Sequence, residues 1–212
     1  MNSGGVCVIP ADTGYVIASA CHSPDSVQKV SQINLESAEK EISIFITSLN
    51  QLQPVKYLLS KEIWAFIEGL WPNPVGFVLP EIGDWLKGFG LASVSSLLDS
   101  SKSVILYISD CGVTGQIIDR VGPIAVRLLT KGTQNLPSQM FAKLLTQVDG
   151  VLLDTAHDTE YEFTVVDCTK MEMGVIDVLK VGAVPTIKVL DVLHTVITRE
   201  DSCSNTVNSI YL

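Results

Sequence analysis

Short runs of apolar residues recur along the chain, and glycine, proline or polar residues separate them. β-Branched residues are frequent in these runs, and runs of this kind between turn-forming residues predict buried β-strands. The runs predict strands over residues 6–9, 15–21, 42–46, 75–79, 104–108, 124–129, 151–153 and 163–167.

Apolar residues at helical spacing lie between several of these strands. Ser23 and Pro24 predict the start of a helix, with Ser23 as its cap and Pro24 at its first position. Residues 61–70 place their apolar side chains on one face, which predicts a second helix. Helices are also predicted over residues 52–59 and 137–145, and residues 175–179 fit either a strand or a helix.

Strands and helices alternate irregularly, which predicts a mixed α/β (α+β) fold with a twisted mixed sheet and flanking helices. We expect one domain over residues 1–199, because 212 residues is near the usual size of a single domain. Residues 80–120 are less regular and are expected to contain an insertion. Residues 200–212 are polar and are expected to form a frayed C-terminal tail.

The composition is that of a folded chain with a full core. Hydrophobic residues make up 47% and charged residues 17%, which argues against intrinsic disorder. No apolar run reaches the roughly 18 residues that a membrane span needs, so we expect no membrane association. Residues 1–5 lack the basic and apolar segments of a signal peptide. We therefore expect a cytoplasmic protein, and a mitochondrial location stays open.

The formal net charge of −9 opposes binding to phosphate backbones and to anionic membranes. A local basic cleft stays open as an alternative, because several cations could converge in the fold. The five cysteines are odd in number and show no CxxC spacing, which favours reduced, mostly buried thiols over a zinc site or a disulfide framework. We expect no protein-bound metal. The sequence contains neither a P-loop nor a GxGxxG motif.

Four segments, in order along the chain, resemble the motifs of one enzyme family. Residues 4–15, GGVCVIPADTGY, are similar to a glycine pair and strand followed by PT(D/E)TxYGL. Residues 70–79, LWPNPVGFVL, are similar to LWPGPLTxxL, and residues 125–127, AVR, to a strand with the sequence VRxP. Residues 164–183 are similar to STVVD followed by (L/I)RxGA. On these motifs the chain resembles a divergent member of the YrdC-like family, the L-threonylcarbamoyladenylate synthases.

The resemblance implies a twisted sheet around a concave, positively charged cleft. It implies synthesis of threonylcarbamoyladenylate and pyrophosphate from L-threonine, bicarbonate and ATP, for the N6-threonylcarbamoyladenosine modification of tRNA. ATP is then expected as a magnesium complex, because cations must offset the charge of the triphosphate and of the pyrophosphate that forms.

The same resemblance carries over a set of candidate site residues. Thr13 and Tyr15 match the opening motif and are the candidates for binding threonine. The nucleotide-binding candidates are Arg127, Thr155, His157, Thr164 and Lys180. Of these, Thr155 and His157 stand in the place of a Ser-Ala-Asn motif, Thr164 is matched to the hydroxyl residue that opens STVVD, and Lys180 stands where an arginine is usual. No residue is assigned a catalytic role.

Several motif positions are altered in ways that bear on activity. Ala11 and Gly76 stand where the motifs have threonine or serine, and Val16 stands where they have glycine. A Lys-x-Arg motif after the first helix is replaced by Asn34 and Glu36, and a carboxylate beside a triphosphate is repulsive.

Two functional hypotheses follow, and both stay open at this point. The first is a threonylcarbamoyl-AMP synthase, weakened by the altered motifs. The alternative is a catalytically degraded YrdC-like domain that binds nucleotide, RNA or a protein partner. Each candidate residue also has a plain structural reading: a core aromatic for Tyr15, a solvent-facing arginine for Arg127, and a polar loop for the Thr-x-His sequence.

Overall fold

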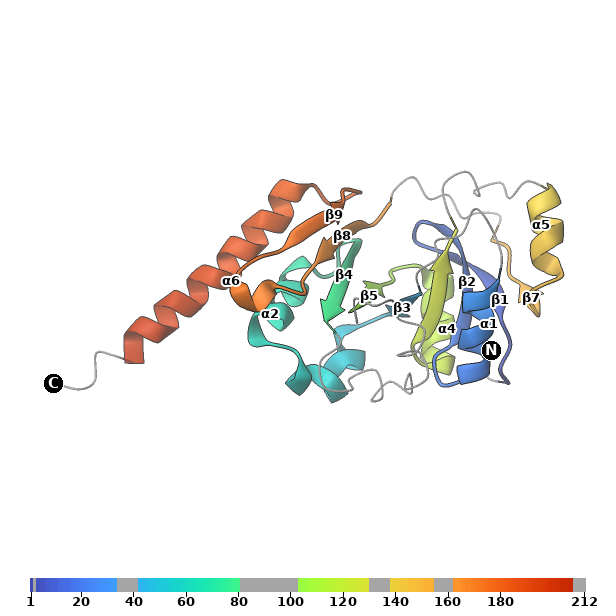
Figure 1. Cartoon of the computed structure of the whole chain (residues 1–212), viewed down its shortest axis with the longest axis horizontal. Coiled ribbons are helices and arrows are strands. Elements are labelled where there is room, and N and C mark those ends of the chain that lie inside the picture. The colour runs from blue at the N-terminus through green and yellow to red at the C-terminus, as the bar shows by residue number, and fades with distance from the viewer. Residues whose placement is uncertain (2, 34–41, 81–102, 130–137, 155–161, 208–212) are drawn as a thin grey trace.

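The computed structural model describes residues 1, 3–33, 42–80, 103–129, 138–154 and 162–207. Nine strands of this part of the chain form one mixed sheet in the order β7-β1-β2-β6-β3-β5-β4-β8-β9 (Figure 1). The strands are β1 (Cys7–Ala11), β2 (Gly14–Ala20), β3 (Ser43–Ile46), β4 (Val75–Pro80), β5 (Ser103–Ile108), β6 (Ile124–Leu128), β7 (Gly150–Val151), β8 (Thr164–Asp167) and β9 (Asp177–Lys180).

The sheet contains both kinds of strand pairing. Antiparallel pairs join β1 to β2, β2 to β6, β6 to β3, β5 to β4 and β8 to β9. Parallel pairs join β3 to β5, β4 to β8 and β1 to β7. The predicted mixed α/β fold is confirmed.

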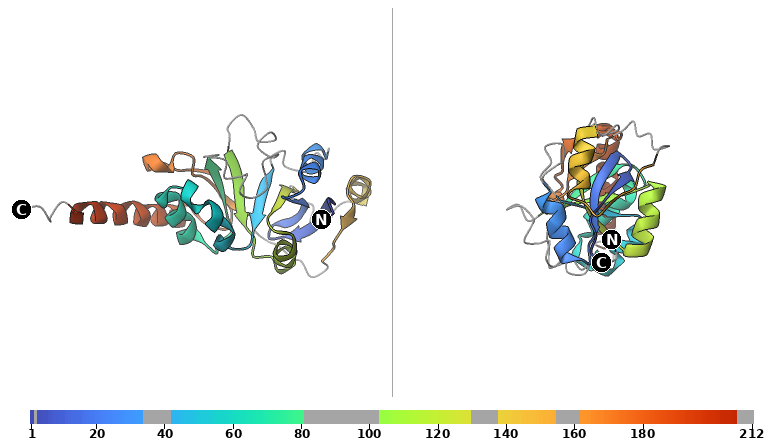
Figure 2. Two further views of the ribbon diagram at one scale, coloured as in Figure 1. Left: turned by 90° about the horizontal axis from the view of Figure 1, so that it is seen from below. Right: turned by 90° about the vertical axis from the view of Figure 1, so that its right-hand side faces the viewer.

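Helices cover both faces of the sheet (Figure 2). Seen end-on, α1 and α4 lie on opposite sides of the strands near the N-terminus. The helices are α1 (Pro24–Gln32), α2 (Lys61–Leu70), α4 (Gly112–Val121), α5 (Ser138–Leu145) and α6 (Thr186–Val207), with 3-10 helices η1 (Leu49–Leu58) and η3 (Met171–Met173).

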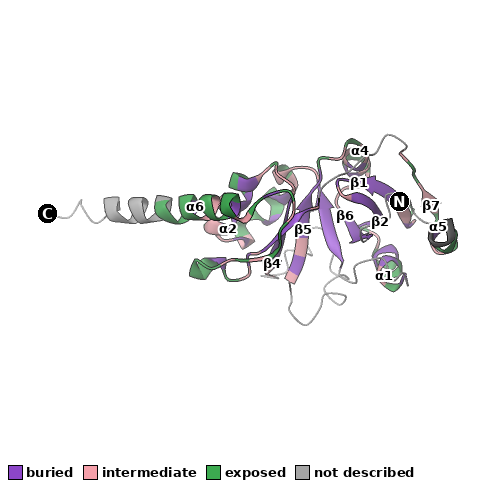
Figure 3. Cartoon of the chain, turned by 90° about the horizontal axis from the view of Figure 1, so that it is seen from above, coloured by how far each residue is buried: buried purple, intermediate pink, exposed green. Residues whose placement is uncertain are grey.

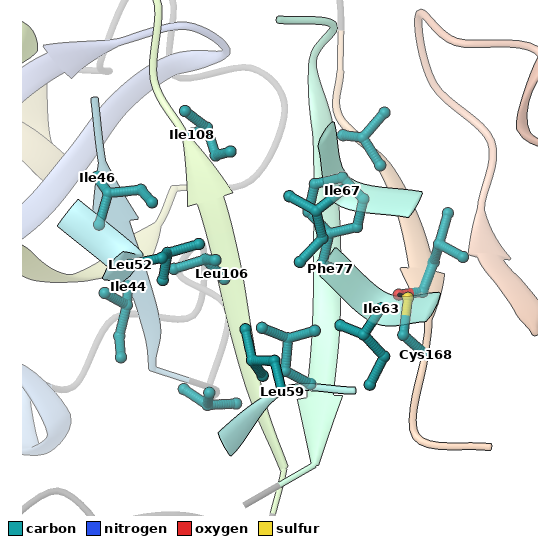
Figure 4. Close-up of a cluster of buried hydrophobic side chains, with 14 of the residues drawn as sticks. Ile44, Ile46, Leu52, Leu59, Ile63, Ile67, Phe77, Leu106, Ile108 and Cys168 are labelled. Atoms are coloured by element: carbon teal, nitrogen blue, oxygen red, sulfur yellow. Dashed lines mark hydrogen bonds between the residues drawn. The ribbon is translucent and has the colours of Figure 1, made fainter. Parts of the chain in front are cut away.

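The largest hydrophobic core lies on the sheet face covered by η1, α2 and α6. Phe77 of β4 lies beside Ile63 and Ile67 of α2 there, and Ile44 of β3 and Leu106 of β5 lie beside Leu52 of η1 (Figure 4). Strand side chains alternate between faces, so the neighbours of these residues along β3, β4 and β5 point to the opposite face. That opposite face has its own buried cluster, which includes Ile118 of α4.

Most predicted elements are confirmed within one or two residues at their ends. The helix predicted over 61–70 is α2, and Ser60 caps it by accepting a hydrogen bond from the Ile63 amide at 3.2 Å. The helix predicted to begin at Ser23 and Pro24 is α1. Of the helix predicted over 52–59, residues 52–58 form part of the 3-10 helix η1. Of residues 175–179, which fitted either a strand or a helix, residues 177–179 belong to strand β9.

Two regions differ from the sequence predictions. Residues 103–121 of the predicted insertion form β5 and α4, which belong to the sheet and its cover, and residues 81–102 lie outside the described residues. The predicted C-terminal tail begins inside α6, which continues to Val207. The helix was missed there because its last part has no apolar periodicity.

Candidate functional site

The tip of the β1–β2 hairpin carries Thr13, and Asp12 fixes this tip to the start of α4. Asp12 is 5% exposed. Its Oδ2 accepts a hydrogen bond from the Ser109 hydroxyl at 2.6 Å, and its Oδ1 accepts one from the Asp110 amide at 2.8 Å. Thr114 of α4 also donates a hydrogen bond to the Pro10 carbonyl. The half-buried Thr13 is therefore held on a rigid turn.

Tyr15, the second candidate for binding threonine, is a buried residue of β2. Its ring packs in a cluster with Ile17, Val30 of α1 and Leu144 of α5. Its hydroxyl lies 3.2 Å from both the carbonyl oxygen and the amide nitrogen of Asp154, donating to the first and accepting from the second. These contacts connect β2 to the segment after β7, which agrees with the structural reading of Tyr15 as a core aromatic.

Arg127 is buried beneath the C-terminal end of α1 and is only 4% exposed. Its Nη1 donates hydrogen bonds to the carbonyls of Val30 at 3.2 Å and Ser31 at 3.4 Å, and also to the Ile33 carbonyl. The last carbonyls of a helix have no partner within the helix, so the guanidinium supplies the missing donors. Burial lowers the pKa of Arg127. The structure thus gives this arginine a role in holding α1 on the sheet, and it is not the solvent-facing residue of the alternative reading.

Thr164 at the start of β8 is fully buried, and the fold uses its hydroxyl completely. The hydroxyl donates to the Val184 carbonyl at 2.7 Å and accepts from the amides of Gly182 at 2.9 Å and Val184 at 3.1 Å. A hydroxyl has one donor and two acceptor positions, so no capacity is left for a nucleotide. Gly182 is required in this turn, because a Cβ there would lie 2.6 Å from the carbonyl carbon of Phe163.

Lys180, at the end of the edge strand β9, forms an ion pair with Glu162. Its Nζ lies 3.4 Å from Glu162 Oε2, and the two side chains are 43% and 27% exposed. An exposed pair of this kind contributes about 0–1 kcal/mol. The carboxylate nevertheless offsets the positive charge that the nucleotide interpretation needs.

The strand order separates the candidates into two groups. Thr13 lies in the turn between β1 and β2, and Tyr15 and Arg127 lie on β2 and β6, whereas Thr164 and Lys180 lie on β8 and β9. The strands β3, β5 and β4 lie between β6 and β8, which corresponds to about 19 Å along the sheet at the usual strand spacing. Thr155 and His157 lie outside the described residues, as do Asn34 and Glu36.

Three aromatic rings occupy the sheet face opposite the main core. The Tyr107 ring lies 4.4 Å from that of Phe163 and 5.3 Å from that of Phe45, measured between centroids. Phe45 and Phe163 are 6.0 Å apart in an edge-to-face arrangement. Tyr107 is 2% exposed and covers Gly76, where a Cβ would lie 2.8 Å from Cζ and 2.9 Å from Cδ1 of the ring. A side chain at position 76 is excluded unless the ring moves.

This aromatic cluster gathers positions where the family motifs carry hydroxyl groups. Gly76 and Ala11 stand where the motifs have threonine or serine, and Ala11 belongs to the same buried cluster as Tyr107. The match of STVVD also has to be corrected. Residues 164–167 read TVVD, so Phe163 takes the place of the serine and Thr164 that of the threonine. The residue pattern before β8 could have shown this, but the position of Tyr107 required the structure.

The described residues do not fit a magnesium–ATP complex. Arg127 and Thr164 are engaged by the fold, Lys180 is paired, and apolar rings fill the sheet face that carries Gly76. Within the part of the chain that the structure describes, no group of three histidine, cysteine or acidic side chains could hold a metal ion. In that same part, no helix has the length and apolar character to cross a bilayer.

Comparisons with known proteins agree with the fold. The Sua5/YciO/YrdC family model, described as "Telomere recombination", matches residues 1–180. None of the curated proteins matches the chain. The structure of E. coli YciO is similar with a TM-score of 0.65 and 16% identity, covering 88% of this chain and 87% of YciO.

The Sua5 protein of P. abyssi, solved in complex with L-threonine, is similar with a TM-score of 0.63 and 16% identity. The match covers 90% of this chain and 54% of the Sua5 chain, so this chain spans about half the length of that protein. A structure of MTH1692 from Methanobacterium thermoautotrophicum has a TM-score of 0.51 and 23% identity, covering 80% of this chain and 77% of that chain. At these identities the likeness to the solved structures shows the fold alone.

Proposed function

The chain belongs to the Sua5/YciO/YrdC family, and from that premise we propose that it is a non-catalytic member that binds a protein partner instead of making threonylcarbamoyladenylate. One observation carries the proposal. The rings of Phe45, Tyr107 and Phe163 fill the sheet face over the altered motif position Gly76, and Ala11, the second altered position, belongs to the same buried cluster. A site for two polar substrates needs hydrogen-bonding groups on that face, and burial without such partners costs several kcal/mol per polar group.

The choice of a protein partner rests on charge and on exposed apolar surface. The net charge of −9 opposes RNA and free nucleotides, and the positively charged candidates described above are engaged by other groups. Exposed apolar side chains lie on η3, on β9 and the turn after it, and on α6, whose ribbon is largely coloured as exposed in Figure 3 where it is described. Exposed apolar patches of this kind mark protein interaction sites. They include Met173 (72%), Leu179 (60%), Val181 (61%) and Ile187 (65%).

The loss of synthesis is tested by pyrophosphate release from ATP and magnesium, with L-threonine and bicarbonate present or omitted. We expect no threonine-dependent release from the folded protein. Release that requires both threonine and bicarbonate would overturn the proposal, provided that an active member of the family assayed in parallel gives the same dependence.

The partner surface is tested with two single charge substitutions, Ile187→Lys and Tyr57→Lys. Tyr57 is 81% exposed on η1 and serves as the matched control away from the patch. A partner protein is first identified by cross-linking to the wild type. Its cross-link should disappear with Ile187→Lys and persist with Tyr57→Lys. Equal cross-linking to both variants would show that the patch is not the surface involved.

A weakened synthase is the second candidate function. It is favoured by the family membership and by Thr13, which is half-buried at a hairpin tip and keeps part of its surface open to solvent. Under this interpretation Thr13→Ala would reduce the pyrophosphate release measured in the same assay. The two candidate functions are therefore separated by one experiment.

A further inference from the structure

A separate pocket lies between β1, β7 and α4, at the opposite end of the sheet from β8 and β9. Its volume is about 530 Å³, which is within the range of about 300–1,000 Å³ that small-molecule pockets occupy. Of the threonine- and nucleotide-binding candidates that the structure describes, none lines it. Its walls include Cys7, Ile9, Ile117, Val121, Val151 and Leu152.

The walls of this pocket are apolar and partly open to solvent. Leu152 is 44% exposed, and Cys7, Ile117 and Val151 are half-buried. Burial raises the pKa of the Cys7 thiol, and this outweighs the opposing effect of the nearby Met1 ammonium. The thiol is therefore neutral at pH 7 and adds to the apolar lining. Covering these side chains would remove apolar surface from water, which favours an apolar ligand.

One cationic side chain, Arg120, is present in the wall of the pocket. It lies in the last turn of α4 and is exposed. Within the described residues, its guanidinium makes no hydrogen bond or ion pair. The Asp149 carboxylate near β1 is not in the wall, and its Oδ2 accepts a hydrogen bond from the Val6 amide at 2.8 Å. The pocket thus combines a mostly apolar interior with one available cationic side chain, and Met1, whose ammonium lies near Cys7, also lines it.

We propose that this pocket binds a small apolar molecule that carries one anionic group, such as an apolar carboxylate. The apolar part would lie among Ile9, Ile117 and Val151, and the carboxylate would pair with Arg120. Ile9 belongs to the same buried cluster as Tyr107, and Cys7, Ile117 and Val121 pack against that cluster. The site is nevertheless distinct from the proposed function, because none of the three aromatic rings lines the pocket.

The probe is decanoate, compared by calorimetric titration with decanol and decylamine, which have the same chain and a neutral or positive head. Decanoate should bind most tightly and decylamine most weakly. Octanoate and dodecanoate extend the series, and each added methylene that is buried should raise the affinity by up to about fourfold.

Three variants separate the contributions of the ligand's charged head group and of its alkyl chain. Arg120→Met should lower the affinity for decanoate about fivefold and leave decanol unchanged, because a partly exposed ion pair contributes little more than that. Lys143→Met on α5 is the matched loss of one exposed positive charge, and it should have no effect. Gly150→Leu should abolish binding of both probes by filling the pocket. A Cβ at position 150 would meet Cys7 Sγ at an ordinary 3.6 Å, so the backbone there accepts the first carbon of a side chain.

An independent readout is the rate at which iodoacetamide alkylates Cys7, measured on the isolated peptide by mass spectrometry. Decanoate should slow alkylation at Cys7 and leave the rate at Cys111 unchanged. The proposal is overturned if none of the three probes binds, if decanoate and decylamine bind equally, or if folded Gly150→Leu binds decanoate like the wild type. If Gly150→Leu does not fold, Val121→Trp takes its place with the same criterion.

Discussion

The ring of Tyr107 lies directly over Gly76, and it fits there because Gly76 has no side chain. A Cβ at position 76 would lie within 3 Å of three ring carbons of Tyr107. The two residues are paired across β4 and β5 in the sheet. The small residue and the large ring are thus a complementary pair. Restoring the hydroxyl residue of the family motif would require the aromatic cluster to rearrange.

This relationship predicts the outcome of restoring the motif residue. Gly76→Thr should lower the free energy of unfolding by about 1–3 kcal/mol, because it overpacks a buried site. Tyr107→Ala should also destabilise, by leaving a cavity. The double variant should lose less stability than the sum of the two, as measured by urea denaturation. Additive losses would show that the two side chains do not compete for one space.

Replacing Arg127 tests whether it serves the fold. Arg127→Met should lower the free energy of unfolding by about 3 kcal/mol, because the α1 carbonyls lose charged donors in a buried place. Amide hydrogen exchange should rise in α1. The exposed Arg120→Met is the control and should change stability by less than about 0.5 kcal/mol. A folded Arg127→Met protein of unchanged stability would contradict the role described for this residue.

Thr164 offers a nearly isosteric substitution. Thr164→Val should cost about 2–4 kcal/mol, since it leaves the Val184 carbonyl and two amides without their partner in a buried turn. Thr164→Ser keeps the hydroxyl and should cost much less. Hydrogen exchange at the Gly182 and Val184 amides provides the local readout. Equal effects of the two substitutions would mean that the hydroxyl contributes no more to stability than the methyl group, which would contradict this role.

The buried thiols predict how stability depends on pH. Burial raises the pKa of Cys21 and of Cys168 far above the ordinary range. The unfolded chain therefore loses protons first, and stability is fully present below about pH 8.5 and falls as the pH rises beyond it. Each thiol should contribute a slope of about 1.4 kcal/mol per pH unit in that range. The Cys21→Ala/Cys168→Ala variant, although less stable, should show a shallower slope. An unchanged slope would contradict this account.

The sequence predicted the strands and the first two helices well because their signals are local. Apolar runs between turn residues marked the strands, and Ser23 with Pro24 marked α1. α4 was missed because Gly112 and Gly115 are poor helix formers, and its apolar residues Ile117, Ile118 and Val121 are few. Tertiary packing against β1 compensates for this weak local preference.

The candidate site was less accessible to sequence reasoning. Matching motifs gave residue types at Arg127 and Thr164, but not the direction in which their polar groups point. Each residue binds backbone groups that are distant in sequence, such as the Val30 carbonyl for Arg127. Tyr107 lies in none of the matched motifs. Its ring can fill the sheet face only because Gly76 is paired with it in the sheet. Pairings of this kind are set by register, which the sequence alone does not determine.

Isothermal titration of L-threonine and magnesium–ATP into the folded protein tests the central claim most directly. If the aromatic cluster of Phe45, Tyr107 and Phe163 fills the sheet face, neither ligand should bind, alone or together, at millimolar concentration. Saturable micromolar binding of ATP that is strengthened by threonine would contradict the account and establish that a substrate site remains open.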